Sequence, residues 1–251
     1  MITEPANRPN VSKGTNFREA SELLQAIPQE SSLSNRIDFL SAAFLGRPYL
    51  ENSLIGGPET PEVFTVTLDG FDCVTYLETV LALAVSKTSG DFLTTIRQLR
   101  YENGEVGWKR RNHFMIDWAR KNEELGFIQD LTTGPGSIRR SRTLGIIDGL
   151  PRRKVSFKCF PRSDLSQLYR RCETGDVILF VSTRKLLDVF HVGLMVRHAK
   201  GNGPLLRHAT RKAGSVIEQD LAEFVDQNRM SGVILLRPTD LNRQASSGAR
   251  R

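Results

Sequence analysis

The chain has 251 residues, of which 39% are hydrophobic and 25% charged. This composition fits a single large globular domain with a buried core and excludes a disordered chain. The formal net charge of +7 raises the question of a nucleic-acid partner. Basic residues gather at 109–111, 139–142 and 152–154, but each group borders a turn or loop and none is interleaved with aromatic residues. We therefore predict solvated basic surfaces and no nucleic-acid partner.

Export and membrane signals are missing from the sequence as written. It contains no run of eighteen apolar residues, so no membrane span is predicted. The start, MITEPANRPNVSKG, lacks the basic patch and apolar stretch of a secretion signal. We expect a cytoplasmic protein, or a periplasmic or extracellular one if the natural start lies upstream.

The chain contains three cysteines, Cys73, Cys159 and Cys172. Their odd number and wide spacing give neither a disulfide framework nor the C-x-x-C pairs of a zinc site. We therefore expect at least one free thiol, and neither a metal nor another cofactor.

The first half of the chain is predicted to be mainly helical. Residues 1–16 are expected to form a loose arm and 241–251 a disordered basic tail, which leaves one domain over 17–240. Helices are predicted at 17–27, 35–45, 72–87, 91–101 and 112–124, with a short strand at 64–68. The helix 72–87, DCVTYLETVLALAVSK, is apolar on most faces and should lie at the centre of the fold.

The second half changes to strands. The Gly, Pro and Arg-rich span 132–153 is expected to be a loop that could form a flap, and a short helix is expected at 161–171. Strands are predicted at 176–182, 189–197, 205–210 and 232–237, and a late helix at 217–227. Helices followed by strands indicate an α+β fold, with N-terminal helices packed on a small antiparallel sheet.

Cys73 is the first residue that suggests chemistry. It stands at the second position of the predicted central helix, where the helix dipole and unpaired backbone amides stabilise a thiolate and could bind an oxyanion. A cysteine in an apolar helix is often only a small core residue. The preceding Asp72, however, would be an unusual choice for packing alone.

Two histidines could supply a base for this thiol. His191 opens the strand HVGLMVR, where alternation puts it on the face of Gly193 and Met195, and His208 lies in the next predicted strand. Neighbouring strands could bring both imidazoles together. A thiol, a base and a third group that orients the base form the arrangement used in nucleophilic hydrolysis.

Five motifs in order resemble those of NlpC-type peptidoglycan hydrolases of papain-like architecture. They are LGRPYLENSLIGG, GFDCVTYLETVLALA, TGDVILFV, HVGLMV and LLRHATRKAGSV. More narrowly, the GRPY segment, the DCVT wording and the inserted RNHFMIDWARKN resemble the N-acetylmuramoyl-L-alanine amidase-like branch. The resemblance runs from about residue 35 to residue 237.

The resemblance implies that Cys73 is the nucleophile, His191 the general base and His208 the polar partner that orients the imidazole. Tyr49 would face the site, where its hydroxyl could donate to the substrate carbonyl; alternatively it is a core aromatic residue. Val74 and Thr75 stand where the peptidase members carry Ser and Gly, a departure from the peptidase-type subsite.

Further substrate contacts follow from the branch signature. Asp72 and the inserted Arg111, Asn112, His113 and Trp118 are predicted to bind substrate, the inserted group by lining a sugar pocket. The structural alternative makes Asn112 a helix cap and Trp118 a core anchor. Glu78 is expected to be the buried partner of an arginine such as Arg47.

The resemblance implies an amidase that hydrolyses the N-acetylmuramoyl-L-alanine bond of peptidoglycan fragments through a thioester, without a cofactor. One alternative is an endopeptidase that cuts the γ-D-glutamyl bond of stem peptides. Another is a catalytically silent module that binds wall polymer. The sequence leaves the oligomeric state open.

Overall fold

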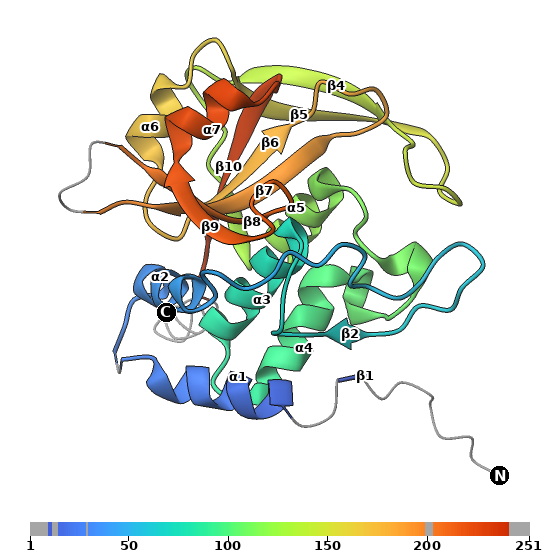
Figure 1. Ribbon diagram of the computed structural model, residues 1–251. Helices are drawn as coiled ribbons and strands as arrows, with labels where there is room; N and C mark the ends of the chain where they lie inside the picture. The colour runs from blue at the N-terminus through green and yellow to red at the C-terminus, as the bar shows by residue number, and fades with distance from the viewer. Residues whose placement is uncertain (1–9, 12–14, 29, 199–202, 241–251) are drawn as a thin grey trace, which may run out of the picture.

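A central antiparallel sheet separates two groups of helices in the computed structural model of the chain (Figure 1). The structure describes residues 10–11, 15–28, 30–198 and 203–240. The helices are α1 (Thr15–Ala26), α2 (Leu33–Ala43), α3 (Cys73–Val85), α4 (Ser89–Arg100), α5 (Met115–Glu124), α6 (Ser166–Arg171) and α7 (Leu221–Gln227), with 3-10 turns η1 (Glu102–Gly104) and η2 (Trp108–Arg110). No helix in these residues is long and apolar enough to cross a membrane.

The described strands form two sheets. They are β1 (Asn10–Val11), β2 (Thr65–Val66), β3 (Ile128–Asp130), β4 (Ile138–Leu144), β5 (Arg153–Pro161), β6 (Val177–Val181), β7 (Val189–Val196), β8 (Leu205–Thr210), β9 (Ser215–Asp220) and β10 (Gly232–Pro238). The eight-stranded sheet has the order β4-β5-β10-β6-β7-β8-β9, and β3 pairs with β10. The short β1 and β2 pair in parallel.

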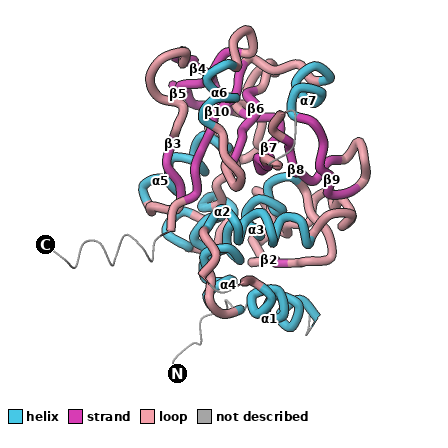
Figure 2. The backbone as a smooth tube through the Cα atoms, turned by 90° about the vertical axis from the view of Figure 1, so that its left-hand side faces the viewer, coloured by secondary structure: helices cyan, strands magenta, loops and turns pink. Residues whose placement is uncertain are grey.

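Both faces of the sheet are covered, and this explains the uninterrupted apolar sequence of β6, VILFV. Val177, Leu179 and Val181 belong to the core shared with the N-terminal helices. Ile178 and Phe180 pack in a second core with residues of α6 and α7. In the view turned by 90°, α6 and α7 lie at the opposite end of the molecule from α1 and α4 (Figure 2).

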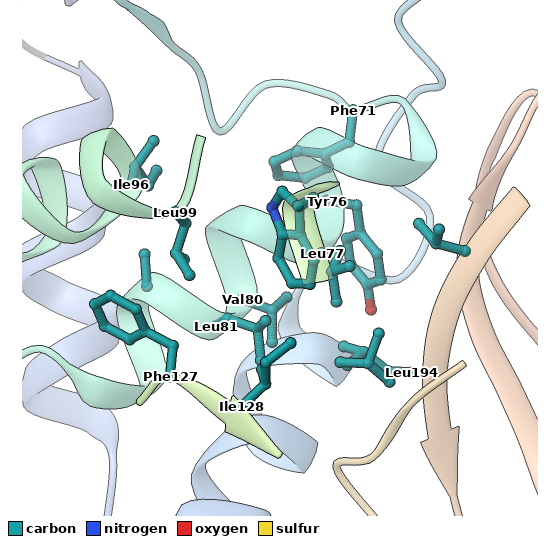
Figure 3. Close-up of a cluster of buried hydrophobic side chains, with 14 of the residues drawn as sticks. Phe71, Tyr76, Leu77, Val80, Leu81, Ile96, Leu99, Phe127, Ile128 and Leu194 are labelled. Carbon is teal, nitrogen blue, oxygen red and sulfur yellow. The ribbon is translucent and has the colours of Figure 1, made fainter. Parts of the chain in front are cut away.

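The core is centred on α3, which is apolar on almost every side. Leu77, Val80 and Leu81 of this helix lie between residues of α4 and Leu194 of β7 (Figure 3). The helix begins where Asp72 caps it and ends at Ser86, whose backbone N–H donates to the carbonyl of Leu83. The predicted central helix is therefore confirmed, with bounds that differ by one or two residues.

A buried ion pair ties α3 to its neighbours. Arg100 of α4 donates from Nε to Oε2 of Glu78 on α3 over 2.7 Å, and each side chain is 3% exposed. A second nitrogen of Arg100 donates to the carbonyl of Thr65 in β2 over 2.6 Å. The indole of Trp118 on α5 donates to the other Glu78 oxygen over 3.2 Å. The expected partner of Glu78, Arg47, instead pairs with Glu19 of α1.

Two predicted boundaries at the N-terminal end are wrong. Within the expected loose arm 1–16, residues 10–11 form β1 and α1 begins at Thr15. Helix α2, predicted at 35–45, begins at Leu33 after its cap Ser32, whose hydroxyl accepts from the Asn35 backbone N–H. The predicted basic tail, 241–251, lies outside the described residues.

The sheet is larger than predicted, although the four predicted strands are confirmed as β6, β7, β8 and β10. The expected loop 132–153 contains β4, which pairs along its length with β5. This strand was not predicted because its sequence, IRRSRTL, is rich in arginine and only part of it faces a core. The predicted helix 217–227 begins as β9, which pairs with β8, and becomes helical only at Leu221.

We predict that Glu78→Ala destabilises the protein by about 3–5 kcal/mol, because it leaves the buried Arg100 guanidinium without its counter-charge. Chemical denaturation followed by circular dichroism measures this change. Glu102→Ala is the matched control, since its pair with Arg110 is half exposed and should cost less than about 1 kcal/mol. Equal effects of the two substitutions would contradict the role given to the buried pair.

Candidate active site

Cys73 occupies the first turn of α3, at a cavity of about 240 Å³. Asp72 precedes it as the helix cap: its Oδ1 accepts from the backbone N–H of Val74 over 2.9 Å and from that of Thr75 over 2.7 Å. Asp72 also lines the cavity. Because the cap uses both of those amides, the backbone N–H of Cys73 is the donor left for an oxyanion at this end of the helix.

His191 lines the same cavity from β7, which packs against α3. A bulge in the pairing of β6 with β7 puts His191 opposite Phe180 and Val189 opposite Val181. Bulges of this kind re-aim side chains beside functional sites. No hydrogen bond joins Cys73 to His191 within the described residues, and in enzymes without substrate such contacts are often long.

His191, His208 and Gln219 form a chain of hydrogen bonds across β7, β8 and β9. His191 Nε2 lies 2.5 Å from His208 Nδ1. His208 Nε2 lies 3.2 Å from the amide oxygen of Gln219. An amide oxygen only accepts, so His208 carries its proton on Nε2 and accepts on Nδ1. His191 must then donate from Nε2, which leaves its Nδ1 as a free proton acceptor.

The positions of the two rings depend on Phe224 of α7 and on Gly193 of β7. The Phe224 ring stacks on His191 with centroids 5.4 Å apart and meets His208 edge-on at 5.3 Å. A side-chain carbon at Gly193 would lie 3.1 Å from the Cβ of His208 and 2.6 Å from a methyl group of Leu206. Glycine therefore permits the close approach of β8 that brings His208 to His191.

Burial keeps the thiol and both imidazoles neutral. It raises the pKa of the Cys73 thiol to about 12, helped by the negative charge of Asp72 and opposed by backbone N–H groups of Val192, Cys73 and Val74. Burial and the neighbouring His208 lower the pKa of His191 to about 3, and burial lowers that of His208 to about 4. The thiolate expected from the helix dipole is thus outweighed by desolvation.

Tyr49 lies beside this group. Burial, and then the charges of Cys73 and Asp72, raise the pKa of its hydroxyl, while a hydrogen bond from Arg211 opposes the rise. Its backbone N–H donates to the carbonyl of Gly214 over 2.8 Å. The residue is half-buried, and its side chain packs on the core.

The inserted segment 111–113 forms one wall of the cavity. Arg111 lies over the Trp108 ring, with its guanidinium carbon 4.8 Å from the centroid, and pairs with Glu62 over 3.1 Å. Asn112 donates from its side chain to the carbonyl of Leu99 over 3.2 Å. His113 Nε2 lies 2.7 Å from the carbonyl of Trp108, and burial lowers the pKa of His113 to about 4.

For Trp118, the structure fits the alternative given above, a core anchor. It is 0% exposed and its indole bonds to Glu78, which makes it a core anchor under the cavity. Asn112 is not the cap of α5, because that helix begins at Met115 after Phe114. The N-terminus of α5 is capped by Asp188, whose Oδ2 accepts from the backbone N–H of Ile116 over 2.8 Å.

Four residues of the site escaped the sequence analysis: Gln219, Phe224, Asp188 and Trp108. Strand register places Gln219 beside His208, and no local pattern marks it. Asp188 carried a signal, since an acidic residue directly before a buried strand is unusual. Within the described residues, no group of three or more His, Cys, Asp or Glu side chains could hold a metal ion.

Comparison with known proteins identifies the family. The model of the AmiA-like, N-acetylmuramoyl-L-alanine amidase-like family matches residues 39–233, and the chain belongs to this family. The fold is similar to that of a Legionella pneumophila protein, at 23% identity and a TM-score of 0.78 over 88% of this chain and 94% of that one. It is also similar to an N-acetylmuramoyl-L-alanine amidase from Bacteroides uniformis, at 22% identity and a TM-score of 0.72 over 83% and 100%. No curated protein matches the chain.

We predict that alkylation of Cys73 by iodoacetamide is slow at pH 7 and still rises above pH 9, because the resting thiol has a pKa of about 12. Peptide mass spectrometry after timed labelling follows each cysteine separately. The buried Cys159 and Cys172 are internal controls, and denatured protein gives the ordinary thiol profile. A labelling midpoint below pH 8 at Cys73 would mean that the helix dipole dominates.

Proposed function

We propose that this protein is a cysteine amidase with a papain-like, NlpC-type site, and that it hydrolyses the N-acetylmuramoyl-L-alanine bond of peptidoglycan fragments. The family supports an amidase that acts on peptidoglycan. One observation carries the mechanism: Cys73 and His191 face a common cavity, and the free Nδ1 of His191 is the ring atom left to take a proton. A module that only binds wall polymer would not require His191 to keep a free proton acceptor at Nδ1.

In the proposed reaction the muramoyl carbonyl carbon lies at the Cys73 sulfur. The S–H proton passes to Nδ1 of His191 as the sulfur attacks, because both groups are neutral at rest. This gives a tetrahedral intermediate whose oxygen carries the negative charge. His191 then gives its proton to the alanine nitrogen, the C–N bond breaks and the peptide leaves, with the muramoyl group held as a thioester.

Two donors support the developing oxyanion. The backbone N–H of Cys73 has no carbonyl or carboxylate partner among the described residues, since Asp72 bonds to the amides of the next two residues. The Tyr49 hydroxyl accepts from Arg211, so its own proton is free to be donated to the substrate. Such preorganised donors supply a large share of the stabilisation in acyl transfer.

Water completes the cycle. His191, neutral again after the peptide has left, takes a proton from a water molecule that attacks the thioester carbonyl. The C–S bond then breaks, the proton returns to the sulfur, and N-acetylmuramic acid is released and loses the proton of its carboxyl group to water. No step uses a metal ion or another cofactor.

We predict that Cys73→Ala lowers release of free peptide from muropeptides by at least about a thousandfold, the scale of a lost nucleophile. Mass spectrometry of the products locates the bond that is cut. Cys172→Ala, on a buried thiol remote from the cavity, is the matched control. Fragments cut after D-glutamate would replace the amidase with a γ-D-glutamyl endopeptidase, and cleavage by Cys73→Ala would refute the nucleophile.

We predict that Gln219→Leu lowers kcat/KM about a hundredfold, because the two imidazoles lose the acceptor that fixes their tautomers. Gln219→Glu keeps an acceptor and should retain most of the activity. Its carboxylate raises the pKa of His208, so the acid limb of the pH profile moves to higher pH. In the wild type this limb lies well below 6.5, since the pKa values of both histidines are lowered.

Gln227→Leu is the control for these variants, because Gln227 lies on α7 and bonds to Lys212 and Glu223 outside the cavity. Equal activity of Gln219→Leu and Gln227→Leu, or an unshifted profile in Gln219→Glu, would remove Gln219 from the relay.

A further inference from the structure

A second cavity adjoins the catalytic one. It has a volume of about 420 Å³ and lies between α5, η2 and the residues that lead into β5. The two cavities share three lining residues, Arg111, Asn112 and His113. The second cavity therefore lies directly beside the cavity at Cys73, with residues 111–113 bordering both.

The lining of the second cavity is mainly basic. Its charged residues are Lys109, Arg110, Arg111, Arg120, Lys121 and Arg153 against Glu102, Asp117 and Glu124. Six positive and three negative side chains leave a formal excess of three positive charges. A concave surface lined by one sign of charge concentrates oppositely charged ligands.

Two of these cations have no carboxylate partner among the described residues. Arg110 and Lys121 pair with Glu102, and Arg153 pairs with Asp117. Lys109 and Arg120 take part in none of the ion pairs. Arg120 donates only to the carbonyl of Ser156 over 2.6 Å, which holds the guanidinium in place without neutralising it. Both charges are available to an anionic ligand.

The shared wall is polar and is held by its neighbours. Arg111 keeps a buried Nε atom without a hydrogen-bond partner. The Trp108 carbonyl can only accept, so His113 donates to it from Nε2 and its Nδ1 remains an acceptor. The wall therefore offers polar groups to a ligand in either cavity.

The two halves of the proposed substrate differ in charge. Once its lactyl carboxyl is part of the amide, the muramoyl half carries no carboxylate, whereas the peptide half carries that of D-glutamate and of each later acidic residue. Resting on the proposed function, we infer that the second cavity binds the carboxylate-bearing peptide half through Lys109 and Arg120. The uncharged sugar half then lies on the other side of Cys73.

The test compares two substrates that differ by one carboxylate. They are N-acetylmuramoyl-L-alanyl-D-glutamine, which keeps only the α-carboxylate, and its α-amide, which carries no carboxylate. For the wild type, kcat/KM should be about tenfold higher with the free carboxylate, the scale of one hydrogen bond to a charged group. The ratio should fall to about one in Lys109→Ala/Arg120→Ala, while kcat/KM for the amide stays within about twofold of wild type.

Lys87→Ala/Arg170→Ala is the matched control. It removes the same net charge from exposed positions at the end of α3 and on α6, and should keep the wild-type ratio. Equal rates for the two substrates in the wild type would overturn the inference. So would a preference that survives in Lys109→Ala/Arg120→Ala or disappears in the control.

A binding measurement separates this inference from the proposed reaction. Titration calorimetry of free L-alanyl-D-glutamate into the wild-type protein should show binding that is about tenfold weaker in Lys109→Ala/Arg120→Ala. Such binding without cleavage of either substrate would support the basic cavity and refute the amidase. Cleavage without preference or peptide binding would support the amidase and overturn the inference.

Discussion

The site depends on one interaction, the desolvated pair of Glu78 and Arg100. Two charges with 3% exposure are tolerated only where each oxygen and nitrogen finds a partner. That requirement brings together α3, α4, the Trp118 indole of α5 and the Thr65 carbonyl of β2. Both residues of the pair also line the cavity at Cys73. The residues beneath Cys73 thus form a polar network in which any shift would leave a buried charge without its partner, and this network holds the first turn of α3 in place.

Burial also determines the resting chemistry of the site. The same removal from water that keeps the thiol of Cys73 protonated keeps His191 and His208 uncharged. At rest, such a site contains no thiolate–imidazolium ion pair between Cys73 and His191. In the proposed reaction, charge separates only while a substrate carbonyl is under attack, and the neighbouring N–H donors are then oriented toward it at no further cost. Neutral groups are also cheaper to bury, which is consistent with the proposed nucleophile lying against the main core.

Sequence patterns predict those parts of the fold that a single chain segment determines. The apolar run after Asp72 predicts α3. The strands formed by TGDVILFV and HVGLMV are predicted correctly because both of their faces are buried. β4 and β9 were missed, since their charged residues belong to edges of the sheet that pack on one side only. In the site, residue types point to Cys73, His191 and His208. Gln219 could not be predicted, because its place beside His208 follows from strand register. Both readings of Trp118 stayed open in the sequence, because an aromatic residue on a helix fits a pocket and a core equally well.

The relay of His191, His208 and Gln219 ends in an amide and contains no carboxylate. In the proposed mechanism, a positive imidazole in this relay has no permanent counter-ion at its far side among the described residues. It is stabilised only by the negative charge that builds up on sulfur and on the substrate oxygen, and it loses that stabilisation when the intermediate collapses. In that mechanism, the event that expels the amine also drives the return of the proton. Protonation of the leaving amine by His191 would then depend on the charge that develops on the bound substrate and not on a permanent charge in the protein. Without substrate, the site would remain neutral and unreactive.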